Sequence, residues 1–116
     1  MTARLLFALA LLFGAATPAS AHKPSDSYLT LAVDGSTVNG QWDIALRDLE
    51  FAIGVDGDGD GQLTWDEIRA RHQAIAAYAL ARLTITGCPI TGGEQLIDHH
   101  TDGAYTVIRL TGSCPA

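Results

Sequence analysis

The sequence lacks the short motifs by which hydrolases and nucleotide-binding proteins are usually identified. It contains no HExxH zinc-protease motif and no glycine-rich phosphate loop that ends in lysine. No serine stands in a nucleophile-elbow sequence. With its cysteines expected to pair, as argued below, no thiol remains to act as a nucleophile. We therefore expect that this chain is not an enzyme.

Basic residues are scarce. Only 7 Lys and Arg stand against 13 Asp and Glu, which gives a formal net charge of −6. An acidic protein without a basic patch does not attract nucleic acid or anionic lipid surfaces. We expect no nucleic-acid partner, and the sequence leaves the identity of any protein partner open.

Long apolar runs are missing except near the start of the chain. Arg4 precedes an apolar run from Leu5 to Phe13, and an A-x-A site follows at Ala19–Ala21. This order is typical of a secretory signal peptide, and the run is shorter than the roughly 20 residues that a transmembrane helix needs. We predict a signal peptide over residues 1–21. One exported domain without a membrane span, periplasmic or extracellular, would occupy residues 22–116.

The sequence has just two cysteines, Cys88 and Cys114. An even number of cysteines in an exported chain favours a disulfide, because exported proteins meet an oxidising environment. The alternative is a pair of free or metal-binding thiols, but the CxxC spacing of such sites is missing. We predict a bridge between Cys88 and Cys114.

Hydrophobic periodicity predicts both strands and helices. Alternating residues over 28–33 and 38–46, around the turn sequence Asp34-Gly35-Ser36, predict a β-hairpin. Residues 47–55 fit a short helix, although a strand is an alternative. Further strands are expected over residues 83–86, 95–99 and 105–111.

The strongest helix signal extends from Thr64 to Leu83. Thr64 with Glu67 three residues later fits a capping box, and the segment is rich in alanine. The order of elements predicts an α+β fold, in which a small antiparallel sheet or sandwich packs on this one long helix.

One twelve-residue stretch carries clear chemistry. Residues 56–67 read Asp-Gly-Asp-Gly-Asp-Gly-Gln-Leu-Thr-Trp-Asp-Glu and fit the pattern D-x-D-x-D-G-x5-E at every constrained position. With Asp, Glu and Gly each at about 6–7%, such a match has a chance probability on the order of 10⁻⁶ per window. The alternative is an acidic, solvated loop.

The pattern predicts a calcium site, because Ca²⁺ takes six to eight oxygen ligands in a flexible cage. Carboxylates at alternate positions place oxygens around one point, and Gly61 permits the sharp turn that follows. The last carboxylate returns from the start of the next helix and offers both of its oxygens. The expected ligands are Asp56, Asp58, Asp60, the carbonyl of Gln62, Thr64 through a water molecule, and Glu67.

The stretch resembles the calcium loop of the EF-hand family. Only one loop is present, and the entering helix is short, so the resemblance implies a mainly structural ion and argues against a sensor with two opening helices. More widely, the segments 22–29 and 41–49 with the acidic loop resemble the extracytoplasmic front part of bacterial HupE/UreJ-type membrane proteins. That resemblance implies an alternative function as an accessory domain of a nickel, cobalt or copper handling membrane system.

Three histidines bear on this alternative. His22 would become the mature N-terminus, where an amine and an imidazole together can chelate copper or nickel. His99 and His100 could add ligands, but adjacent residues of a strand point to opposite faces, so only one of them would face a given site. An ordinary exposed terminus and loop pair is the other interpretation.

Overall fold

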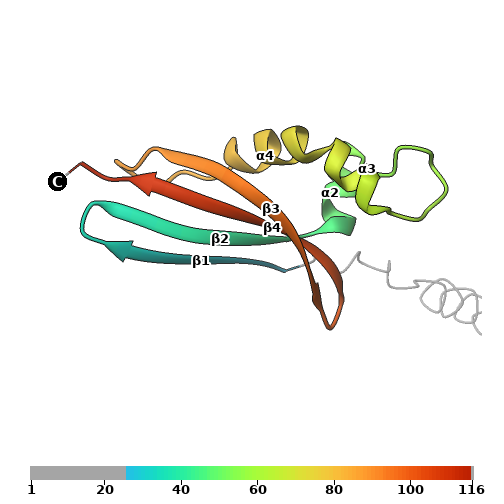
Figure 1. Ribbon diagram of the computed structural model, residues 1–116, viewed down its shortest axis with the longest axis horizontal. Coiled ribbons are helices and arrows are strands. Elements are labelled where there is room, and N and C mark those ends of the chain that lie inside the picture. The colour runs from blue at the N-terminus through green and yellow to red at the C-terminus, as the bar shows by residue number, and fades with distance from the viewer. Residues whose placement is uncertain (1–25, 116) are drawn as a thin grey trace, which may run out of the picture.

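The computed structural model describes residues 26–115, so the predicted signal peptide and His22 lie outside the described residues. A single antiparallel sheet forms the main layer, with the spatial order β1-β2-β4-β3 (Figure 1). Its strands are β1 (Ser27–Asp34), β2 (Thr37–Ala45), β3 (Ile90–His100) and β4 (Gly103–Ser113).

Two tight hairpins connect the strands. Asp34 pairs with Thr37 across a turn at Gly35 and Ser36, and Gly35 has a φ of 60°, which suits a residue without a Cβ. This confirms the expected first hairpin. The β3–β4 hairpin turns at Thr101 and Asp102. β2 and β4 pair along their whole overlap, so the sheet is continuous from β1 to β3.

Short helices lie on one face of the sheet (Figure 1). They are α2 (Leu46–Ile53), α3 (Trp65–Ala70) and α4 (His72–Leu80), of which α2 packs on β4 and α4 packs on β3. The core lies between this layer and the sheet and contains Ile44, Leu46, Leu49, Val55, Ile68, Ile75, Ala79, Ile108 and Leu110. Within residues 26–115, no helix is long and apolar enough to cross a membrane.

The expected α+β fold, with its sheet packed on one long helix, is wrong. The structure is a small four-stranded antiparallel sheet with short helices, and the segment predicted as one helix is divided at Arg71. Arg71 has φ −104° and ψ 4°, and its N–H donates to Ile68 O in a tight turn. Its guanidinium donates to the carbonyls of Ile53 (3.1 Å) and Gly54 (3.0 Å). The end of α2 thus obtains donors for two of its carbonyls, and the same residue marks the break between α3 and α4.

The strand expected over residues 83–86 is also wrong. Only an isolated bridge between Ile85 and Cys88 forms in this segment, around a turn in which Gly87 has a φ of 76°. β-branched residues favour a strand, but the preference is realised only where a neighbouring strand is available. Here the edge beside β4 is taken by β3.

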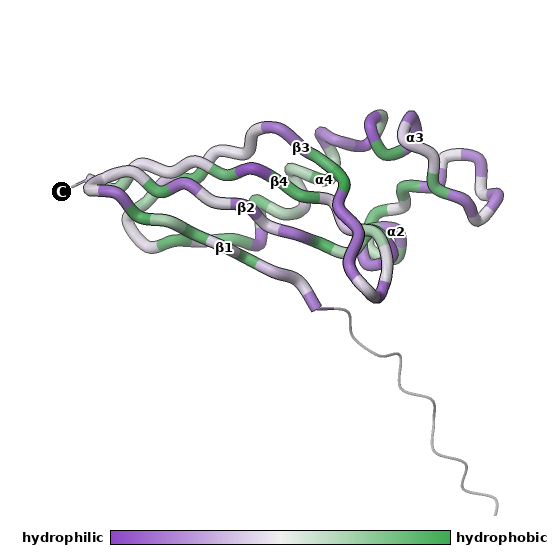
Figure 2. Tube along the Cα trace, turned by 60° about the horizontal axis from the view of Figure 1, so that its bottom comes forward, coloured by the Kyte–Doolittle hydropathy of each residue, from purple (hydrophilic) through white to green (hydrophobic). Residues whose placement is uncertain are grey.

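The sheet is covered unevenly. Every residue of β1 is exposed, and Leu29, Leu31 and Val33 remain 42%, 39% and 72% exposed. Figure 2 shows hydrophobic positions along β1 at the edge of the sheet. The helices therefore bury mainly the β2–β4–β3 part, and the core is small for the size of the sheet.

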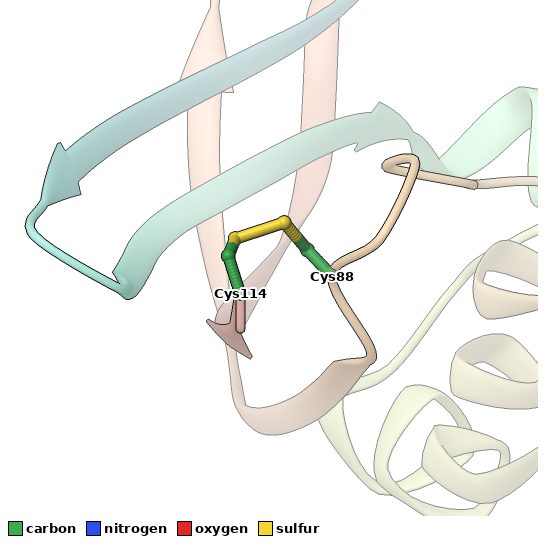
Figure 3. Close-up of a disulfide and its surroundings, with 2 residues drawn as sticks. All are labelled: Cys88 and Cys114. Atoms are coloured by element: carbon green, nitrogen blue, oxygen red, sulfur yellow. A yellow bond between two sulfur atoms is a disulfide. The ribbon is translucent and has the colours of Figure 1, made fainter. Parts of the chain in front are cut away.

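A disulfide joins Cys88, just before β3, to Cys114, just after β4 (Figure 3). The predicted bridge is confirmed. The Cys114 N–H also donates to Ser36 O at 2.7 Å, so the bridge lies beside the β1–β2 turn. An oxidised cysteine pair is consistent with an oxidising, extracytoplasmic location.

Removal of the disulfide should lower stability substantially. The bridge spans a sequence separation of 26, and a loop of that length restricts the unfolded chain by about 3–4 kcal/mol in the chain-entropy model. The double variant Cys88→Ala/Cys114→Ala should therefore show a lower midpoint of urea unfolding than the oxidised protein. Reduction of the wild-type protein should produce the same loss, and equal midpoints in all samples would contradict a stabilising bridge.

Candidate metal centre

The acidic loop, residues 56–67, connects α2 to α3 and projects away from the sheet (Figures 1 and 2). Its two ends are fixed in the core, because Val55 is 1% exposed and Ile68 is 4% exposed. Leu63, inside the loop, also packs against the core. The loop is therefore held at both ends and at one interior point, while its carboxylates remain near solvent.

Four carboxylates of the loop converge. Asp56, Asp58, Asp60 and Glu67 each offer one oxygen, and these oxygens all lie within 4.8 Å of one another. Carboxylate oxygens are the hard donors that Ca²⁺ and Mg²⁺ prefer. The chemistry of this donor set therefore fits a hard divalent cation, and the role of these residues as ligands stays a prediction.

Backbone amides of the loop hold three of the carboxylates in place. Asp56 accepts from Gly59 N–H at 3.0 Å and from Gly61 N–H at 2.7 Å. The carboxylate of Asp58 accepts from Asp60 N–H, and that of Asp60 accepts from Gln62 N–H. Gly61 has a φ of 80°, a conformation that L-residues with a Cβ rarely adopt. The alternation of Asp and Gly thus produces a loop coiled around its own carboxylates.

Glu67 connects the end of the loop to its beginning. Its Oε1 accepts from the N–H and the hydroxyl of Thr64, both at 3.0 Å, and Thr64 Oγ1 accepts from Glu67 N–H. This is the predicted capping box, which is confirmed. Glu67 Oε2 accepts from Gly57 N–H at 2.6 Å. One carboxylate therefore caps α3 and also fixes the first turn of the loop.

Two residues that the sequence did not single out support the entering side of the loop. Glu50 in α2 accepts through Oε2 from the N–H groups of Val55 and Asp56, the latter at 2.7 Å. Arg71 binds the carbonyls of residues 53 and 54, as described above. Glu50 acts on the residues just after α2, whereas Arg71 acts across the loop on carbonyls 17 and 18 residues before it. No local motif marks the contacts of Arg71.

Gln62 and Thr64, the two remaining predicted ligands, lie in the same loop but make different contacts. Gln62 contributes its backbone N–H to Asp60, and the position of its carbonyl as a ligand stays a prediction. The hydroxyl of Thr64 is occupied by the capping box, 3.0 Å from Glu67 Oε1. Thr64 therefore contacts the group of four carboxylates through its hydrogen bonds to Glu67.

The pKa values of two loop carboxylates move in opposite directions. The Gly61 N–H donor is the main reason that the pKa of Asp56 lies below its ordinary value. The pKa of Asp58 is raised, chiefly because this carboxyl shares a hydrogen bond with the Asp56 carboxylate. Neighbouring carboxylates that cannot all carry a full charge together favour a bound cation or a shared proton.

A cavity of about 710 Å³ borders the loop. It lies among the loop, α2 and the β3–β4 hairpin, and its apolar wall includes Leu63, Trp65 and Ile97. His99 lines this cavity. His100 instead lies 3.1 Å from Asp43, on the other face of the sheet. The two adjacent histidines thus point to opposite faces, as the alternation of strand residues requires.

Comparison of the chain with protein-family models, curated proteins and solved structures found no match. The resemblances to EF-hand loops and to HupE/UreJ-type proteins therefore stay predictions that rest on the residues quoted for them.

A second group of hydrogen bonds joins the β3–β4 turn to the start of α2, next to the cavity. Arg47 Nη2 lies 2.8 Å from Asp102 Oδ2. The hydroxyl of Tyr105 donates to the same carboxylate at 2.8 Å, and the Tyr105 side chain is fully buried. The pKa of Asp102 is lowered, first by the hydrogen bond from Arg47. Burial, followed by the bond to Asp102, raises the pKa of Tyr105 to about 12.

Tyr105 should therefore ionise late in the folded protein. An unperturbed tyrosine ionises near 10, whereas Tyr105 should form its phenolate only at about 12. Because the folded state favours the neutral phenol, this contribution to stability is complete below the ordinary pKa and is lost as the pH rises towards 12. Absorbance titration of tyrosinate should show this late step and lose it in Tyr105→Phe. A single step near pH 10 in the folded protein would contradict the burial.

Proposed function

We propose that this chain is an exported calcium-binding protein whose ion, held by residues 56–67, stabilises the fold. The observation that carries the proposal is the convergence of four carboxylate oxygens, from Asp56, Asp58, Asp60 and Glu67, within 4.8 Å of one another. These residues stand in the spacing of a known calcium loop. The disulfide and the signal-peptide pattern support export.

The donor set favours calcium over other common cations. All four side-chain donors are oxygens, which excludes a preference for soft thiolate-binding metals. Mg²⁺ demands near-ideal octahedral geometry and keeps several of its waters, whereas Ca²⁺ accepts six to eight ligands in a flexible arrangement. A loop that offers four carboxylates together with the carbonyl of Gln62 suits the larger ion.

The position of the loop argues for a structural role. Its ends continue directly into Val55 and Ile68, both in the core. A cation between the carboxylates would remove their mutual repulsion and hold α2 and α3 in one arrangement. A sensor would need two long helices that change their angle. Here the flanking helices have 8 and 6 residues, and Arg71 ties them together.

The binding proposal predicts a sharp difference between two neighbouring acids. Glu67→Gln should weaken calcium binding at least about tenfold, or 1.4 kcal/mol of binding free energy, because the charged end ligand is lost. Asp66→Asn is the matched control, because Asp66 is an exposed residue that pairs only with Arg69 among the ion pairs of the described chain. Calorimetric titration with calcium measures both. Equal effects would mean that the loop attracts cations only as a diffuse acidic patch.

The structural role predicts a large dependence of thermal stability on calcium. At a hundredfold excess over its dissociation constant the ion adds about 2.7 kcal/mol. For a domain of this size the melting midpoint should rise by about 10 °C or more. Far-ultraviolet circular dichroism below the transition should change little, because α4 packs on β3 away from the loop.

The Glu67→Gln variant should lose most of this rise in the melting midpoint, while Asp66→Asn should keep it. An unchanged midpoint in the wild-type protein, together with measurable calcium binding, would contradict the structural role while leaving the calcium site intact.

A further inference from the structure

A second group of metal-binding side chains lies on the sheet face opposite the helices. Asp43 in β2 and both Asp98 and His100 in β3 each offer one ligand atom, and these atoms all lie within 4.8 Å of one another. In β2, Ile44 belongs to the core beneath the helices, so its neighbour Asp43 points to the other face. This group is therefore separate from the acidic loop.

Asp43 is an unusual residue for this position, because its carboxylate is buried. The residue is only 5% exposed. Its Oδ1 accepts from Gln41 Nε2 at 3.1 Å, and its Oδ2 lies 3.1 Å from His100 Nε2. A buried carboxylate is costly unless a cation or strong hydrogen bonds compensate it. The neighbouring carboxylate of Asp98 increases the negative charge at this point.

The imidazole of His100 is held in a fixed orientation. The ring of Tyr28 stacks on it with centroids 5.0 Å apart and an interplanar angle of 9°. The ring of Tyr105 contacts it at 4.2 Å with a tilt of 58°. Two aromatic contacts from β1 and β4 thus direct Nε2 at Asp43. A ligand whose orientation is already fixed loses little conformational entropy when it binds.

We propose that Asp43, Asp98 and His100 form a second metal site, which takes a divalent transition metal of the zinc class. One imidazole nitrogen and two carboxylate oxygens are typical donors for Zn²⁺, and three protein ligands leave a coordination position for water. A dication balances both carboxylates. Ca²⁺ takes oxygen ligands, so the imidazole discriminates this site from the acidic loop.

Calorimetric titration of the exported protein with zinc sulfate, in excess calcium, tests the site. The wild-type protein should bind zinc, and both Asp98→Asn and His100→Ala should weaken binding at least about tenfold, since even loss of an outer-shell partner costs 10–100-fold. Asp98 is exposed, so its substitution should leave the fold intact. His99→Ala is the matched control, because His99 lies next to His100 but lines the cavity on the other face.

Cobalt supplies an independent readout, since its visible absorption reports the ligands around the ion. The wild-type and His99→Ala proteins should give the same spectrum, and His100→Ala should lose it. Zinc affinity that is equal in the wild-type, Asp98→Asn and His100→Ala proteins would overturn the proposal. So would binding that disappears in His22→Ala, because the chain terminus would then be the site.

The two proposed metals can be tested separately. Glu67→Gln should keep its zinc affinity, and Asp98→Asn should keep the calcium-dependent rise in melting midpoint. Failure of the calcium site would therefore leave the zinc result interpretable, and the reverse also holds. A Glu67→Gln protein that loses zinc as well would overturn the assignment to Asp43, Asp98 and His100.

Discussion

The repulsion among the carboxylates of one loop is the constraint on which the arrangement of α2, the acidic loop and α3 depends. Asp56, Asp58, Asp60 and Glu67 bring their oxygens within 4.8 Å of one another. Like charges this close raise the free energy of the folded state unless donors or a cation offset them. The loop supplies donors from its own amides, above all Gly61 N–H to Asp56. A bound cation would provide the larger compensation, which supports the proposed calcium ion.

The surroundings of the loop follow from the same constraint. Glu50 holds the N–H groups that enter the loop, Glu67 holds those at its first turn, and Arg71 fixes the carbonyls at the end of α2. Glu50 connects α2 to the start of the loop, Glu67 connects α3 to its first turn, and Arg71 connects the end of α3 to the end of α2, so these contacts form a frame around the carboxylates. The interruption of the long helix at Arg71 is part of this frame.

The sequence predicted the features that depend on near neighbours. The order of acids in the loop, the capping box of Thr64 and the β1–β2 hairpin are local, so their residues specify them directly. The break at Arg71 was missed because the apolar periodicity continues through it, and only carbonyls 17 and 18 residues away reveal it. Asp43 was missed for a similar reason. The alternation of strand residues places Asp43 on the face opposite the helices. His100, whose imidazole lies beside the Asp43 carboxylate, comes from another strand, 57 residues further along the chain.

The pleat of β3 gives one short segment two separate environments. His99 faces the cavity beside the acidic loop, and His100 faces Asp43 on the other side of the sheet. Neighbouring strand residues cannot exchange these faces without a shift of register, and β3 is fixed against β4 from Gln95 to His100. An oxygen-rich loop on the helical side and an imidazole with carboxylates on the opposite face therefore offer different donor sets, which supports the proposal of two different cations. The two groups are separate, because neither donor set includes a residue of the other.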